Sequence, residues 1–180
     1  MRARVQNTTV LDVLDVAIEL ERKTMALYAG FVRTFQDEDE VRQFWFNMAR
    51  SEAAHCGALF LVECILKEDP AVEATSKIRF DMATGTKLRS LLLAYRREQR
   101  RGVNLRRAFE MAVDLEGSEL ENVVVDLLRV VPDTSWRSQS AKMLLHDMGD
   151  LSYMIERYTD DSALLARADE LLEDRAENDD

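Results

Sequence analysis

The 180-residue sequence contains little glycine or proline, with six glycines and two prolines, and only two cysteines. A β-sandwich or β-barrel needs a turn about every 8–12 residues, and such turns draw heavily on glycine and proline. The composition therefore argues against an all-β fold and favours long helices. Cys56 and Cys64 lie eight residues apart within one helical pattern, which suits reduced thiols rather than a disulfide framework.

Long apolar runs are also missing from the chain. No uninterrupted apolar segment approaches the roughly 18 residues that a membrane span requires. Residues 1–9 are basic and then polar, without the apolar centre of a secretory signal. We therefore expect a cytoplasmic protein without a membrane partner. The length fits a single domain, and a hydrophobic content of 47% is enough to bury a core.

The charge of the chain is acidic overall and unevenly distributed. With 24 basic and 34 acidic residues the net charge is −10, so a nucleic-acid partner is not expected. Residues 86–107 carry eight bases and one acid, and residues 160–180 carry nine acids and two arginines. We interpret both segments as solvated helix surfaces. The alternatives are an RNA- or anion-binding patch and a partner-docking tail, although Tyr95 is the only aromatic residue available for base stacking in the basic segment.

Helical periodicity divides the chain into four long segments and two shorter ones. The long segments are expected at about 9–36, 38–68, 103–131 and 135–159, and the shorter ones at about 87–101 and 161–175. Short links join the first long segment to the second and the third to the fourth, whereas a long crossover separates the two pairs. Two hairpins joined in this way are typical of the ferritin-like four-helix bundle. We expect this all-α bundle over residues 1–160, followed by an acidic C-terminal helix or tail over residues 161–180.

Each long segment has an inward-facing row that is apolar at both ends and acidic in the middle. Residues spaced by three and four share one helix face, and antiparallel hairpins of similar length bring the middles of the rows to one level. Six side chains are expected to meet there: Glu21, Glu52, His55, Glu116, Asp147 and Asp150. Carboxylates and an imidazole without a thiolate suit iron or manganese. Two divalent cations would offset about four of the buried negative charges, whose burial alone is costly.

The two halves of the chain resemble each other at an offset of 95 residues. Residues 17–21 match residues 112–116, and the same offset carries Glu52 onto Asp147. Amphipathic patterning alone can produce repeats of this kind. The repeat nevertheless coincides with the acidic positions of the inward-facing rows. We therefore predict a pseudo-two-fold bundle with one metal facing each hairpin.

Glutamate, tyrosine and histidine stand at family-like spacings in the first three long segments. These residues are Glu21 followed by Tyr28, Glu52 followed by His55, and Glu116 followed by Glu119. In this combination the chain resembles the rubrerythrin branch of the ferritin-like superfamily over roughly residues 10–158. The resemblance implies that Glu119 is an additional metal ligand and that Tyr28 is a catalytic residue that tunes the site through a hydrogen bond.

The fourth long segment departs from the family pattern. Where a second Glu-x-x-His motif belongs, the chain has Asp147 and Asp150, and aspartate reaches about 1.5 Å less far than glutamate. The neighbouring His146 points about 100° away from the inward row of a regular helix, so it is not a simple substitute. The chain also has no Cys-x-x-Cys pair of a rubredoxin-type domain. We therefore expect an external electron donor.

Two functions remain open from the sequence. The resemblance implies a homo-oligomeric oxidoreductase with two iron ions, or with manganese or mixed metals, that reduces peroxide or oxidises Fe(II) with O₂. The alternative is a metal-free or degenerate ferritin-like scaffold that acts through protein–protein contacts, because the second imidazole is missing. Metal binding by the acidic layer distinguishes the two.

Overall fold

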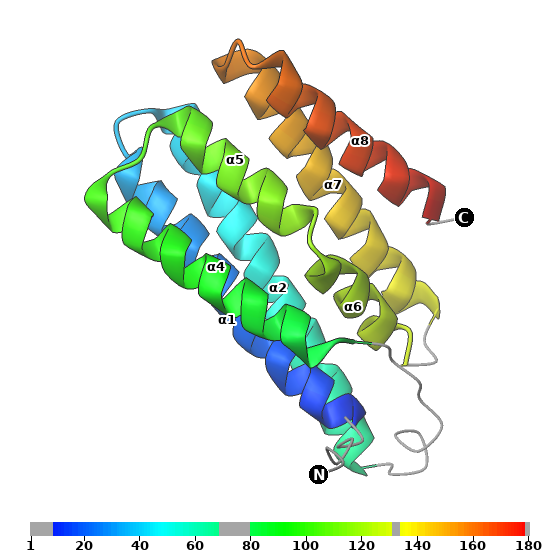
Figure 1. The fold of residues 1–180 in the computed structure, drawn as a ribbon. Coiled ribbons are helices and arrows are strands. Elements are labelled where there is room, and N and C mark those ends of the chain that lie inside the picture. The colour runs from blue at the N-terminus through cyan, green and yellow to red at the C-terminus, as the bar shows by residue number, and fades with distance from the viewer. Residues whose placement is uncertain (1–8, 69–79, 131–133, 179–180) are drawn as a thin grey trace.

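The computed structural model describes residues 9–68, 80–130 and 134–178, except for the side chains of residues 119, 134–145, 177 and 178. Within this part of the chain every regular element is a helix, so the expected all-α class is confirmed. The helices, shown in Figure 1, are α1 (Val10–Thr34), α2 (Asp39–Glu68), α4 (Met82–Arg101), α5 (Leu105–Glu116), α6 (Glu119–Leu128), α7 (Thr134–Tyr158) and α8 (Ser162–Asn178). None of these helices has the length and apolar character needed to cross a bilayer.

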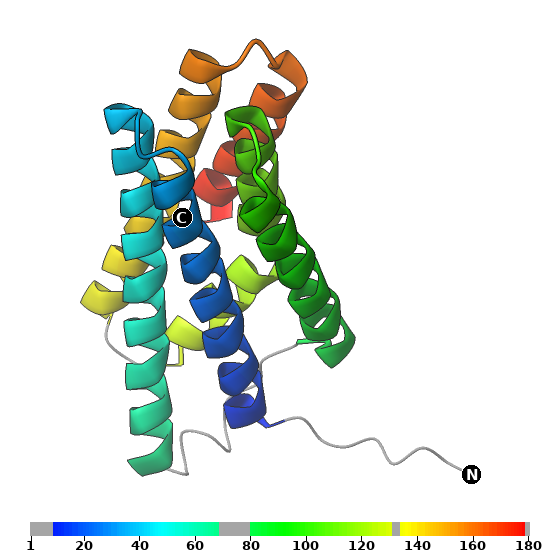
Figure 2. The ribbon, with the colours of Figure 1, turned by 90° about the vertical axis from the view of Figure 1, so that its left-hand side faces the viewer.

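Helices α1 and α2 form an antiparallel pair and lie side by side along their lengths (Figures 1 and 2). α1 begins with a capping box, in which the Thr9 side chain accepts a hydrogen bond from the Asp12 backbone and the Asp12 side chain accepts one from the Thr9 backbone. A short link then leads into α2. Both helices begin and end within two residues of the expected positions. The first part of the crossover that follows α2, residues 69–79, lies outside the described residues.

The basic segment of the chain belongs largely to α4, which runs parallel to α1. Arg89 donates to the Glu19 carboxylate at 2.7 and 2.9 Å, and ten residues later the Gln99 amide donates to the Gly30 carbonyl at 3.1 Å. The guanidinium of Arg96 donates to the backbone carbonyl of Ala26. Two of the cationic side chains of this segment, Arg89 and Arg96, therefore hold α4 against α1.

The expectation of one continuous helix over 103–131 is wrong, because the chain breaks between α5 and α6. Gly117 ends α5, and Ser118 begins α6 by accepting a hydrogen bond from the backbone of Leu120. Serine is a preferred N-cap because its hydroxyl satisfies a free backbone donor. The break changes the direction of the chain in the middle of the molecule, as Figure 1 shows.

The acidic C-terminal segment forms α8, which folds back along α7 and also contacts α5 (Figure 1). Leu164 and Ala168 are buried in the core. Arg167 of α8 donates to Asp114 of α5 at 2.7 Å, and Arg106 of α5 donates to Asp161 at 2.7 Å. α8 is thus packed against the other helices by apolar and charged contacts.

Aromatic side chains fill the core next to the acidic residues. Trp45 is fully buried, and its ring centroid lies 4.7 Å from that of Phe31 and 5.6 Å from those of Tyr28 and Phe109. Aromatic pairs at these separations add stability beyond the area they bury. They also keep water away from the neighbouring acidic side chains.

Candidate metal centre

Five ionisable side chains meet in the interior of the protein. They are Glu21 of α1, Glu52 and His55 of α2, Glu116 of α5 and Glu121 of α6, and each is at most 5% exposed. Glu52 and His55 project from the same face of α2 because residues three apart are neighbours on a helix. Four of the five belong to the layer expected from the sequence, whereas Glu121 does not.

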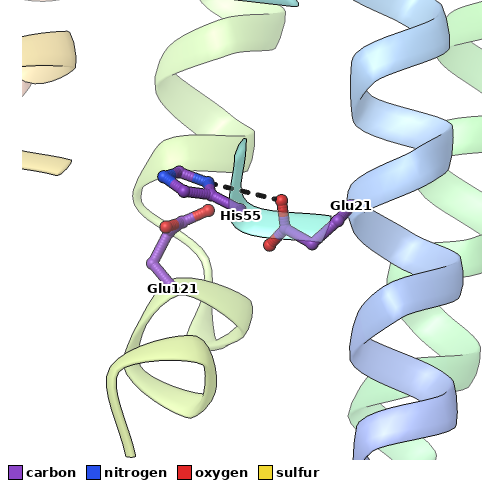
Figure 3. Close-up of side chains that lie close together, drawn as sticks. All are labelled: Glu21, His55 and Glu121. Carbon is purple, nitrogen blue, oxygen red and sulfur yellow. Dashed lines mark ion pairs between the residues drawn. The ribbon is translucent and has the colours of Figure 1, made fainter. Parts of the chain in front are cut away.

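His55 lies at the centre of this group. Its Nδ1 atom is 3.6 Å from Oε2 of Glu21 and 3.6 Å from Oε2 of Glu52. One ligand atom each from Glu21, His55 and Glu121 lies within 4.8 Å of the other two, and Figure 3 shows the two carboxylates reaching the imidazole from different helices. Metal–ligand bonds of about 2.1 Å allow about 4.2 Å between opposite donors. Small side-chain adjustments are therefore enough for these three residues to share one cation.

Most of the donor atoms have no hydrogen-bond partner within the described residues. These atoms are both carboxylate oxygens of Glu21, Oε2 of Glu52, both ring nitrogens of His55 and Oε2 of Glu121. Buried polar atoms are normally satisfied, because each unsatisfied one costs about 1–3 kcal/mol and more when charged. A bound cation would satisfy several of them at once. The residues present thus fit a metal ion of the kind that carboxylates and imidazole bind.

The pKa values in the cluster reflect mutual proximity. Burial lowers the pKa of His55, but the adjacent carboxylate of Glu21 outweighs this effect and the pKa rises to about 9. Burial raises the pKa of Glu52 well above its ordinary value, and the charge of Glu21 adds to the shift. The pKa of Glu121 is raised well above normal by burial and then by the charges of Glu21 and Glu116. The protein without metal therefore holds protons at this site.

Tyr28 fixes the orientation of Glu116. The buried tyrosine hydroxyl donates a hydrogen bond of 2.8 Å to Oε1 of Glu116. Burial and the carboxylate charge of Glu116 raise the pKa of Tyr28 well above 10, so the phenol stays protonated as a donor. The residue expected to tune the site by a hydrogen bond is thus placed to do so.

The fourth segment contributes less than the sequence suggested. Asp147 of α7 is half-buried, and its carboxylate accepts a hydrogen bond from the Ser51 hydroxyl. Asp150 is 44% exposed and lies 3.5 Å from Nδ1 of His146, which is itself 73% exposed. Asp150 therefore lies outside the buried layer in which we expected it. Asp147 already lies at the edge of this layer, and the rotation of about 60° over three helical residues carries Asp150 to the solvent side. The side chain of Glu119, the first residue of α6, lies outside the described residues.

Glu121 was missed because its position depends on the helix break. In one continuous helix, a residue five positions after Glu116 is rotated by about 140° and faces another side. The break at Gly117 and Ser118 removes this constraint and turns Glu121 inward. A signal was present in the Gly-Ser pair and in the Ser-x-x-Glu pattern of residues 118–121, which is typical of a helix N-terminus.

Arg175 of α8 also reaches this region and was not anticipated. Its Nη2 atom donates to the backbone carbonyl of Glu116, the last residue of α5. The same atom lies 4.0 Å from Oε2 of Glu121. The site therefore contains a permanent cation from the C-terminal helix.

Comparison with models of protein families, with curated proteins and with solved structures found no match to this chain in any of the three. The resemblance to rubrerythrins accordingly rests on the residue pattern. Any proposal about function that goes further than this resemblance rests on the geometry of the buried cluster.

Proposed function

We propose that this protein is a ferritin-like, rubrerythrin-like di-iron protein that carries out redox chemistry, either peroxide reduction or Fe(II) oxidation. The observation that carries the proposal is the buried group of Glu21, His55 and Glu121. One ligand atom of each lies within 4.8 Å of the others, and most of their donor atoms have no hydrogen-bond partner in the described part of the chain. The ferritin-like assignment is supported by the α1–α2 hairpin and by acidic side chains that α1, α2 and the α5–α6 segment direct toward one level.

The donor set indicates which residues would hold the metals. Glu21, His55 and Glu121 would hold the first cation, and Glu52 and Glu116 are the remaining buried carboxylates available to a second. Asp147 stands at the edge of the layer as a further oxygen donor. Iron would supply the one-electron chemistry, and manganese or a mixed pair fits the same oxygen-rich set. The electrons would come from an external donor protein.

The surrounding residues of the chain position this chemistry and exclude water from it. Tyr28 holds Glu116 by a 2.8 Å hydrogen bond, and the Trp45 ring packs on Tyr28 at a centroid distance of 5.6 Å. A dry, rigid environment strengthens the interaction of the carboxylates with a cation and limits side reactions. We include a cytoplasmic location and a homo-oligomeric state in the proposal.

A metal-free scaffold is the second candidate function. It is favoured by Arg175, which supplies a positive charge 4.0 Å from Glu121 without any metal. Exposed apolar side chains on α2, including Phe46 at 52% and Phe60 at 59%, give such a scaffold a surface for protein contacts. Metal analysis separates the two candidates.

The test loads the metal-free protein with Fe(II) under anaerobic conditions, removes loosely bound ions and counts iron by mass spectrometry. The wild-type chain should retain at least one iron ion. Glu121→Gln should weaken binding by more than about 100-fold, beyond the range seen for residues that only support a ligand. Asp150→Asn is the matched control and should keep the iron, because Asp150 lies outside the buried layer.

The redox part of the proposal is tested on the same loaded protein. Stoichiometric hydrogen peroxide or O₂ should oxidise the bound iron faster than free Fe(II), and Glu121→Gln should abolish this advantage. Iron retention equal in wild type and Glu121→Gln would exclude the proposed site and favour the scaffold.

A further inference from the structure

Arg175 reaches the metal centre from a helix that lies outside the expected bundle. Its side chain is only 18% exposed, and Nη1 is buried and has no hydrogen-bond partner among the residues that the structure describes. Nη2 donates to the Glu116 carbonyl and lies 4.0 Å from the Glu121 carboxylate. The guanidinium thus bridges the end of α5 and the beginning of α6, between two of the acidic residues of the site.

The packing of α8 places Arg175 at this position. Leu171, one turn earlier on the same face of α8, contacts the helix break so closely that a Cβ atom on Gly117 would lie 2.8 Å from Leu171 Cδ1. The break, which turns Glu121 inward, and the arginine, which lies beside Glu121, are therefore held by the same contact. Figure 1 shows α8 running along α7 with its C-terminal end on the side of α6.

The charge of Arg175 is permanent. A guanidinium remains protonated at any physiological pH, unlike the other groups of the site. The charge of Arg175 acts on the carboxylate of Glu116, and it offsets negative charge that a second divalent ion would otherwise offset. It also repels such an ion, and the repulsion is strong in an interior from which water is excluded.

We propose that Arg175 is an internal counter-cation that controls metal loading: the first ion binds with Arg175 in place, and the second binds only when the guanidinium withdraws. The inference rests on the proposed function, since it concerns the same buried carboxylates. It assigns α8 a regulatory role at the site. In the resting state of the protein that this inference implies, one metal ion is bound and the second is not.

The experiment titrates the full-length metal-free protein with Mn(II) and follows free aqueous Mn(II) by electron paramagnetic resonance. The wild type should bind one ion tightly and a second at least about tenfold more weakly, the range expected from one nearby charge. Arg175→Gln removes the charge but keeps an amide that can donate to Glu116. This variant should tighten the second step by at least about tenfold and show the spectrum of a spin-coupled Mn(II) pair at two equivalents.

Two control variants separate charge from structure. Arg175→Lys keeps the charge and should titrate like the wild type. Arg167→Gln makes the same substitution two turns earlier on α8, where the arginine pairs with Asp114 away from the site, and it should also titrate like the wild type. Each of three results would overturn the inference. The wild type could bind both ions with equal affinity, or the affinity for the second ion could be unchanged in Arg175→Gln. The third is an Arg175→Lys variant that titrates like Arg175→Gln.

Failure of the proposed function gives a different result. In that case neither the wild type nor Arg175→Gln binds Mn(II) more tightly than Glu121→Gln. If Arg175→Gln does not fold without metal, Mn(II) must restore its circular dichroism spectrum, because the ion then replaces the missing charge. A variant that stays unfolded with Mn(II) overturns the inference.

Discussion

A carboxylate that is removed from water needs a hydrogen-bond donor or a cation. The buried carboxylates of this protein differ in which of these partners they have. Glu116 accepts from the Tyr28 hydroxyl at 2.8 Å, whereas both oxygens of Glu21 lack a hydrogen-bond partner within the described residues. An uncompensated buried charge costs several kcal/mol. Glu116 is therefore supported by a hydrogen bond, whereas Glu21 has the imidazole of His55 at 3.6 Å as its charged partner, a role that a bound cation would take over.

Tyr28→Phe should destabilise the metal-free protein by about 1–3 kcal/mol, because Glu116 loses its buried hydrogen-bond donor. Urea unfolding measures the change. Tyr158→Phe is the control: it removes an exposed hydrogen bond to Glu40, also 2.8 Å long, and should cost less than about 0.5 kcal/mol. An equal loss of unfolding free energy in the two variants would contradict the prediction, because burial of the acceptor would then not affect the strength of the hydrogen bond.

Metal binding at pH 7 should release at least one proton, because the pKa of His55 is raised to about 9 and a metal ligand must be the neutral imidazole. Affinity should rise at least about tenfold per pH unit below pH 9, and the contribution of His55 should level off above pH 9, where this residue is already neutral. Calorimetry in buffers with different ionisation enthalpies counts the protons. His146→Gln, at an exposed histidine, should leave the count unchanged, and an enthalpy independent of buffer would contradict the prediction.

At the scale of secondary structure, the break between α5 and α6 determines the composition of the site. Ser118 satisfies the start of α6, Arg175 satisfies the last carbonyl of α5, and Leu171 packs on Gly117 between them. Free backbone groups at helix ends require such partners. The break is thus a stable feature, and it places Glu121 opposite His55.

Gly117→Ala should disturb this break. An added Cβ would lie 2.8 Å from Leu171 Cδ1 and 3.0 Å from the Val113 carbonyl, so we expect a loss of about 1–3 kcal/mol from overpacking. Mn(II) affinity should fall as well, because Glu121 moves with the break. Gly57→Ala is the control in an exposed part of α2, where a Cβ meets no atom of the described residues within 4 Å, and it should stabilise the protein by about 0.5–1 kcal/mol. Unchanged Mn(II) affinity in Gly117→Ala would contradict the prediction.

At the scale of the whole molecule, the site links helices that are distant in sequence. Its residues come from α1, α2, α5 and α6, and the arginine comes from α8. The unfolded chain has no such assembled site, so a metal that binds it stabilises the entire fold.

An excess of Mn(II) of about 100 times its dissociation constant should stabilise the protein by about 2.7 kcal/mol. For a chain of this length the Tm should rise by about 5–11 °C, which circular dichroism melting measures. Glu121→Gln should show no rise, whereas Glu156→Gln, at an exposed position of α7, should respond like the wild type. An equal rise in all three proteins would indicate binding at the surface.

The helices and much of the buried layer could be predicted because both depend on local spacing. The second long segment was expected at 38–68 and forms α2 over Asp39–Glu68, with Glu52 and His55 buried as expected. The expectation failed where the helix is interrupted, because periodicity alone extends through a Gly-Ser pair. It also failed at Asp150, whose side chain is on the solvent side of α7 although Met154, four residues later, is buried.

The sequence by itself determined the all-α class, the approximate extent of the helices and the acidic middle of their inward faces, since helix periodicity acts between residues three and four apart. Only the tertiary structure decided that Glu121 joins His55, that Asp150 stays at the surface and that Arg175 enters the site. The contact between Arg175 and Glu116 joins residues 59 positions apart. Contacts of this kind arise from the packing of whole helices, which no local pattern specifies.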